Sequence, residues 1–329
     1  MVKKLDKQKT IFFFDAHEDI SDAVLYLGQK DFFYSQKNTN SFSQVNWQQL
    51  KATKTRGVFA VSCPVLLTKG KVLPHPNHFE ELLKHLNFYH NLIRQSQGRI
   101  KLIRNKRDLI GWQNDNIIRF LLALEGADSI DSNTRLEVIY NLGIRSLGLV
   151  YNHKNKLGGG FQSRLGLTKL GQRIIRQAEK LGIAIDLSHS NEKTFYQALK
   201  FSRKPLLVSH SGCRALFNHP RNLKDEQIVA LAKKGGVMGI FAVAKFLGGN
   251  TLKDLVRHYL HVLKLVGPKR IILGTDFGAL PPESLLKDFF QLSHINKLFE
   301  ELKKAGIKKS ELERIAYKNL IDFLKVVLT

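Results

Sequence analysis

The stretch TIFFFDAHEDI, residues 10–20, runs five β-forming residues almost directly into a group of titratable ones. An apolar strand of this kind is stable only inside a packed sheet. The polar residues that follow, Asp15, His17, Glu18 and Asp19, must then lie where the sheet meets solvent or a cavity. The stretch therefore predicts a buried strand whose far end borders a candidate site.

Seven other short apolar runs resemble this one, and amphipathic segments with helical spacing lie between most of them. We expect further strands within 57–65, 119–128, 144–152, 182–190, 205–211, 236–243 and 270–278. We expect helices at 78–95, 168–181, 191–201, 224–234 and 251–266. Two final helices, 284–305 and 309–328, would complete an outer ring.

Strand alternating with helix eight times predicts an α/β fold, a (β/α)8 barrel of the TIM type. The 329 residues contain no linker rich in Pro, Ser or Gly, so we expect a single domain over 1–329. A doubly wound open sheet is the alternative, but no glycine-rich phosphate loop follows the first strand. In a barrel, the carboxyl ends of the strands converge on the face that carries the active site.

Composition favours a cytoplasmic protein. No apolar stretch reaches the length of a membrane span, and the apolar run near the basic N-terminus is too short for a signal peptide. The two cysteines, Cys63 and Cys213, are too few for a disulfide framework and are expected to be small buried hydrophobic residues. The net charge of +24 is spread over the polar segments, which predicts a soluble surface rather than a specific nucleic-acid or membrane site.

Five of the eight predicted strands end in residues of the metal-ligand type. Imidazole nitrogen and carboxylate oxygen both bind zinc-like ions, at about 2.0–2.2 Å. His17 and Asp19 could chelate one ion, and Glu125 could bridge it to a second ion about 3.5–4 Å away. The candidates are His17, Asp19, Glu125, His189, His210 and Asp276. We expect the other nine histidines at surface or packing positions.

The order of DAHED, ALEGAD and GTDFG around the block 167–240 resembles the zinc-dependent membrane (renal) dipeptidase family, in its soluble bacterial form. The resemblance implies two Zn²⁺ ions per chain, with His17 and Asp19 on one, His189 and His210 on the other, and Glu125 bridging. It also implies that Arg221, in NHPRNL, holds the substrate's terminal carboxylate, and that the chain forms a homodimer. Asp276 matches an acid near the metal-activated water.

Two positions depart from the family pattern. Tyr151, with His153 two residues later, stands where some members carry a histidine that contacts the tetrahedral intermediate, so we expect Tyr151 to contact the substrate while the oxyanion stabiliser stays unassigned. GTDFGAL lacks the second aspartate of the usual DFDG, which affects the pocket floor more than the chemistry.

The expected reaction is hydrolysis of a small dipeptide, including one with a C-terminal D-residue, by metal-activated hydroxide. Asp276 would take a proton from the water and pass it to the leaving amine. Two alternatives stay open: an amidohydrolase acting on N-acyl amino acids, and a non-catalytic polyanion-binding barrel. The loops 30–50 and 154–163 are expected to line the pocket and to choose between substrates, but their sequences do not translate into a specificity.

Overall fold

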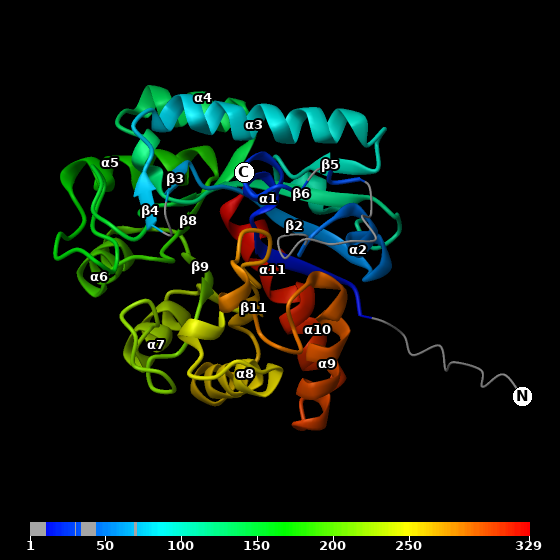
Figure 1. The fold of residues 1–329 in the computed structure, drawn as a ribbon. Helices are drawn as coiled ribbons and strands as arrows, with labels where there is room; N and C mark the ends of the chain where they lie inside the picture. The colour runs from blue at the N-terminus through cyan, green and yellow to red at the C-terminus, as the bar shows by residue number, and fades with distance from the viewer. Residues whose placement is uncertain (1–10, 30, 34–43, 69–70) are drawn as a thin grey trace, which may run out of the picture.

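The computed structural model describes residues 11–29, 31–33, 44–68 and 71–329, and its centre is a closed parallel β-barrel (Figure 1). The sheet runs in the order β2-β1-β11-β10-β9-β8-β7-β6 and closes because β2 also pairs with β6 along six residues. This closure confirms the predicted (β/α)8 barrel and excludes the open sheet. The barrel strands are β1 (Phe13–Glu18), β2 (Thr55–Ser62), β6 (Ile118–Leu124), β7 (Ile144–Gly148), β8 (Ala184–Asp186), β9 (Leu207–Ser211), β10 (Val237–Ile240) and β11 (Ile271–Leu273).

Three strands were absent from the sequence prediction. β5 (Ile100–Leu102) adds a short parallel partner to the first residues of β6, and β3 (Val65–Thr68) forms an antiparallel hairpin with β4 (Lys71–Pro74). Of the segment 57–65, in which a strand was predicted, β2 includes the residues up to Ser62. Pro64 has no backbone N–H for a sheet ladder, and the chain turns there with the Val65 N–H donating to Cys63 O at 2.7 Å.

Helices surround the barrel, and five of them match the predicted segments to within one residue at each end. Where the chain enters a helix, short polar side chains accept backbone N–H groups, as Thr168 does from Gly171 and Asn191 does from Thr194. The five are α3 (His78–Gln95), α5 (Lys169–Leu181), α6 (Glu192–Phe201), α7 (Asp225–Lys233) and α8 (Leu252–Val266). Further helices are α1 (Ile20–Leu25), α2 (Trp47–Ala52) and α4 (Asn133–Asn141).

The predicted helix 284–305 is wrong in its first half. Only α9 (Ile295–Lys304) is an α-helix, and the residues before it form short 3-10 turns at Pro282–Ser284 and Leu292–His294. Asp288 explains part of the difference, because its carboxylate accepts the backbone N–H of Leu252 at 2.7 Å and so fixes the segment against the start of α8. Leu286, Phe289 and Leu292 are buried there without forming an α-helix, while Phe290 is exposed.

The C-terminal segment closes one end of the barrel. α10 (Lys309–Glu313), a π-helical segment (Arg314–Lys318) and α11 (Asn319–Val327) follow one another without a break, in agreement with the predicted helix 309–328. Side chains of α11 join the barrel-interior cluster with Ala184, Leu207 and Val237, which are the first residues of β8, β9 and β10. The amino-terminal end of the barrel is thus filled by apolar side chains, which leaves the opposite end for a site.

Both cysteines are buried free thiols, as predicted. No helix among the described residues combines the length and the apolar character that crossing a membrane requires. Two predictions concern residues outside the described part of the chain. The signal-peptide prediction depends mainly on residues 1–10, and the predicted pocket loop 30–50 includes residues 30 and 34–43.

Candidate active site

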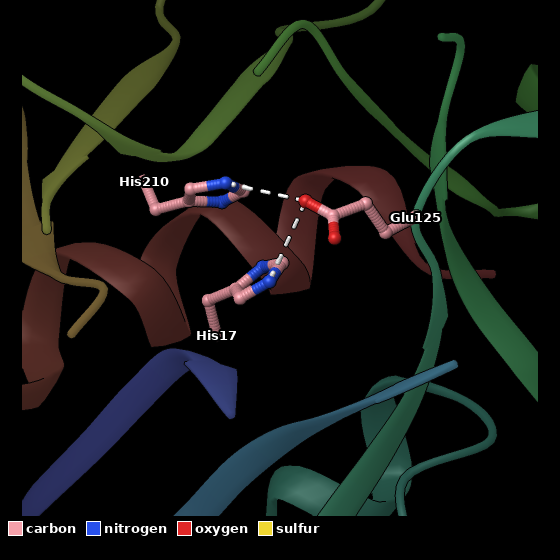
Figure 2. A group of neighbouring side chains, drawn as sticks. All are labelled: His17, Glu125 and His210. Carbon is pink, nitrogen blue, oxygen red and sulfur yellow. Dashed lines mark ion pairs between the residues drawn. The ribbon is translucent and has the colours of Figure 1, made fainter. Parts of the chain in front are cut away.

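Three imidazoles converge on one carboxylate oxygen at the carboxyl ends of the strands. Figure 2 shows His17, from β1, and His210, from β9, pointing at Glu125, which directly follows β6. Glu125 Oε1 lies 3.6 Å from His17 Nε2, 3.2 Å from His210 Nε2 and 3.0 Å from His189 Nε2. The chain turns away immediately after Glu125, where Gly126 has a φ of 78° that few other residues adopt.

A second group of ligand-type atoms lies around His17. Its Nε2 is 3.6 Å from both Asp19 Oδ1 and Asp276 Oδ1. Backbone contacts between the ends of β1 and β11 hold the two carboxylates there, since Asp19 N–H donates to Phe277 O at 2.7 Å and Asp276 N–H donates to His17 O at 3.2 Å. Asp276 and His189 are also non-glycine residues with φ values of 66° and 65°, so local strain helps to aim both side chains into the site.

The outer nitrogens of the histidines have their own partners. His189 Nδ1 lies 2.8 Å from Asn152 Oδ1, and His210 Nδ1 lies 2.8 Å from the Ser209 hydroxyl. The same hydroxyl donates to Asp186 and lies 3.4 Å from His17 Nδ1. With the outer nitrogens as donors, the inner Nε2 atoms would be free to bind a metal ion at the centre of the site, which is how metal-binding histidines are oriented.

The donor set fits divalent cations. His17 Nε2, Asp19 Oδ1 and Glu125 Oε1 are buried and have no hydrogen-bond partner among the described residues. His189 Nε2 and His210 Nε2 lie only 2.9 Å apart, and the outer nitrogen of each ring has a separate partner. Lone pairs and carboxylate oxygens that face one another in a buried site repel unless a cation lies between them. Mixed nitrogen and oxygen ligands of this kind suit zinc-like ions.

Electrostatics within the cluster agree with a cation site. Burial alone lowers the pKa of His17, but the carboxylates of Glu125, Asp19 and Asp276 raise it to about 10. Burial, reinforced by the neighbouring acids, raises the pKa of Asp276 to about 8, whereas burial lowers the pKa of His189 to about 4. Against the effect of burial, the imidazoles hold the pKa of Glu125 well below its usual range. Strong shifts of opposite sign within one cluster are typical of functional sites.

The cluster opens into a cavity of about 720 Å³, a size suited to a small ligand. Arg221 lines it from the loop after β9; its guanidinium is buried, donates to His210 O at 3.0 Å and lies over the Phe241 ring. Tyr151 lines it from the loop after β7 and stacks on the His189 ring at 4.5 Å between centroids. A second cavity, of about 740 Å³, lies between α8 and α9 and contains none of these groups.

The structure thus brings together all six predicted ligand-type residues, with Arg221 and Tyr151 at the same cavity. His153 is exposed and does not line the cavity, whereas His219, expected at a surface or packing position, does. His219 Nδ1 accepts the Arg221 backbone N–H at 3.1 Å. Of the loop 154–163, Phe161 and Gln162 line the cavity.

Sequence reasoning also missed four polar residues around the site. Ser209 directly precedes the predicted His210, and Asp186 lies three residues before the predicted His189, but strand alternation places these polar residues on the opposite face from the histidines. Asn152 follows the predicted Tyr151. Asp22 lines the cavity from α1, and its sequence position three residues after Asp19 gave no signal of that.

The chain is similar to known proteins over most of its length. The sequence model of the membrane dipeptidase family, peptidase family M19, matches residues 3–328. An uncharacterized protein in the pqqA 5' region of Klebsiella pneumoniae is 30% identical over 262 residues, which are 75% of this chain and 96% of that protein. An uncharacterized dipeptidase of Schizosaccharomyces pombe is 30% identical over 220 residues, which are 64% of this chain but only 53% of that protein.

Among solved structures, a metallopeptidase from Rhodobacter sphaeroides, liganded with a phosphinate mimic of the dipeptide L-Ala-D-Ala, has the same fold. It aligns with a TM-score of 0.86 at 22% identity and covers 97% of this chain and 99% of that one. Since the family model spans nearly the whole sequence, the chain belongs to the membrane dipeptidase family, peptidase family M19, and is a metal-dependent hydrolase of peptide bonds.

Proposed function

We propose that the protein hydrolyses the amide bond of small dipeptides, including dipeptides with a D-residue at the C-terminal position. The observation that carries the proposal is the convergence of His17, His189 and His210 on one oxygen of Glu125, with Asp19 beside them. These five residues would hold a pair of Zn²⁺ ions, with Glu125 between them. When bound, such a pair supplies an activated water and polarises the scissile carbonyl group.

Arg221 would bind the terminal carboxylate of the substrate. Its side chain is buried at the cavity wall, and no carboxylate of the described residues lies within ion-pair distance of it. A planar guanidinium offers two parallel N–H donors to one carboxylate, which fixes the position of the peptide as well as its affinity. The bond from the guanidinium to His210 O, 3.0 Å long, ties this anchor to a proposed metal ligand.

Asp276 would hold the proton that moves from water to the leaving amine. Its carboxylate lies on the cavity wall and within 3.6 Å of His17 Nε2, so it borders the place where the amide would be cleaved. A carboxylate that first accepts and later donates a proton serves both steps of an amide hydrolysis. Tyr151, flat against His189, would contact the substrate beside the scissile bond.

The same proposal includes zinc as the metal and a cytoplasmic location. It also includes a single domain that forms a homodimer and has no membrane or specific nucleic-acid partner. The nitrogen and oxygen donor set supports zinc. Two buried free thiols support a reducing compartment.

A substrate panel tests the proposed function. Purified protein supplied with Zn²⁺ is expected to hydrolyse dipeptides such as L-Ala-D-Ala and L-Ala-L-Ala and to leave N-acetyl amino acids intact. Turnover of N-acetyl amino acids alone would instead favour the amidohydrolase alternative. Salt-sensitive retention on nucleic acid with neither hydrolysis nor bound metal would favour the polyanion-binding alternative.

A further inference from the structure

Two buried charges of opposite sign line the cavity without a charged partner. One is Arg221, and the other is Asp22, which is only 4% exposed. Burying an ion without a counter-ion is costly, so an unpaired buried charge at a cavity wall suggests that a ligand supplies the partner. The proposed carboxylate contact explains Arg221. Asp22 has no role among the metal ligands.

Among the described residues, the contacts of Asp22 include no cationic side chain. Its carboxylate accepts a backbone hydrogen bond from Cys63 and lies 3.5 Å from the Ser21 hydroxyl. That hydroxyl makes shorter bonds of 2.8 Å to Val61 O and to His85 Nδ1. His85 is 3.9 Å from the Asp22 carboxylate, and burial lowers the pKa of this imidazole to about 4, so it is neutral at neutral pH.

No Lys or Arg of the described part of the chain lies within ion-pair distance of Asp22. Its side chain is buried at the cavity wall, so a cation that enters the cavity would give this carboxylate a charged partner.

The two charges come from different walls of the cavity. Asp22 lies on α1, directly after β1, near the cavity residues Leu27 and Cys63, whereas Arg221 lies on the loop after β9. In the sheet, β11 and β10 separate β1 from β9. A molecule that carries a positive group at one end and a carboxylate at the other would satisfy both walls at once. A dipeptide is such a molecule.

We propose that Asp22 binds the free α-amino group of the substrate and so restricts the enzyme to peptides with an unblocked N-terminus. This inference rests on the proposed dipeptidase function and adds the determinant of its substrate class. An N-acyl amino acid has no ammonium group, so it would leave Asp22 buried and unpaired. Asp22 would therefore disfavour N-acyl amino acids, which are the substrates of the alternative amidohydrolase function.

The test compares a dipeptide with its desamino analogue, in which hydrogen replaces the amino group. With the metal-loaded wild-type enzyme, kcat/KM should be about 10–100-fold higher for the dipeptide, the size expected for a charge-assisted contact. In Asp22→Asn the preference should fall close to unity, through a higher KM for the dipeptide and little change for the analogue. Metal content and thermal unfolding should stay near wild type.

Glu283→Gln is the matched control, because Glu283 lines the same cavity but is exposed to solvent. It should keep the wild-type preference. A preference below twofold in the wild-type enzyme, an unchanged preference in Asp22→Asn, or an equal loss in Glu283→Gln would each overturn the inference. Calorimetry with phosphinate isosteres of the dipeptide and of its desamino analogue measures how much the amino group adds to binding affinity when no turnover occurs. Failure of the wild type to hydrolyse any dipeptide would overturn the proposed function separately.

Discussion

Ser209→Ala should weaken metal binding although Ser209 is not itself a proposed ligand. Its hydroxyl lies 2.8 Å from His210 Nδ1 and 3.4 Å from His17 Nδ1, and it donates to the buried carboxylate of Asp186. One small group thereby orients imidazoles from two strands. Its removal frees both rings to rotate or change tautomer, so the inner nitrogens are no longer held toward the site.

The expected size follows from these contacts. Loss of an outer partner of a metal-binding histidine costs about 10–100-fold in metal affinity. The Asp186 oxygen left without its donor should lower the free energy of unfolding by about 1–3 kcal/mol. Competition with a chromophoric Zn²⁺ chelator measures the affinity, and chemical denaturation of the same samples measures stability.

Ser188→Ala is the control that distinguishes a loss of imidazole orientation from a general loss of stability. The Ser188 hydroxyl donates to the other oxygen of Asp186 at 2.8 Å and accepts the His210 backbone N–H at 3.2 Å, but it contacts no imidazole nitrogen. Its variant should lose similar stability and keep wild-type metal affinity. Equal Zn²⁺ affinities in wild type, Ser188→Ala and Ser209→Ala would refute the reasoning.

His189→Ala should abolish dipeptide hydrolysis and lower the metal content while the circular dichroism spectrum stays that of a folded barrel; full activity would count against the proposed site. Arg221→Lys should raise KM for dipeptides by about 10–100-fold with a smaller change in kcat, because one ammonium replaces a two-pronged donor, and an unchanged KM would place the carboxylate elsewhere. His258 accepts the Cys213 N–H at Nδ1, and burial lowers its pKa to about 4 from an ordinary value near 6.5. Its neutral form therefore adds stability that is complete above about pH 6.5 and is lost as the pH falls toward 4, by at most about 3 kcal/mol. Denaturation at pH 7 and pH 5 should show a smaller pH dependence in His258→Gln than in wild type, and equal dependences would contradict this.

The barrel could be predicted because its strands are buried on both faces and so appear as continuous apolar runs. β5 escaped detection because it has three residues, one of them a lysine, and pairs only with the first residues of β6. The error at 284–294 has the opposite cause. Leu286 and Phe289 have helical spacing, but they are buried in an irregular segment whose path is fixed by contacts of Asp288 with α8.

The candidate ligands could be predicted because each follows or ends an apolar run, and the barrel brings such positions together. Asp22 and His219 could not, since their approach to the cavity depends on how α1 and the loop after β9 fold back over the barrel end. The residues that hydrogen-bond to the proposed metal ligands could be predicted only in part. Ser209 stands beside a predicted histidine, yet only the structure shows one hydroxyl contacting two imidazoles.

Anomalous X-ray scattering from crystals of the Zn²⁺-loaded protein, recorded on both sides of the zinc edge, measures where the metal lies. Two zinc peaks on either side of the Glu125 carboxylate, one reached by His17 and Asp19 and the other by His189 and His210, are the expected result. A single peak, or peaks beyond the reach of Glu125, would contradict it.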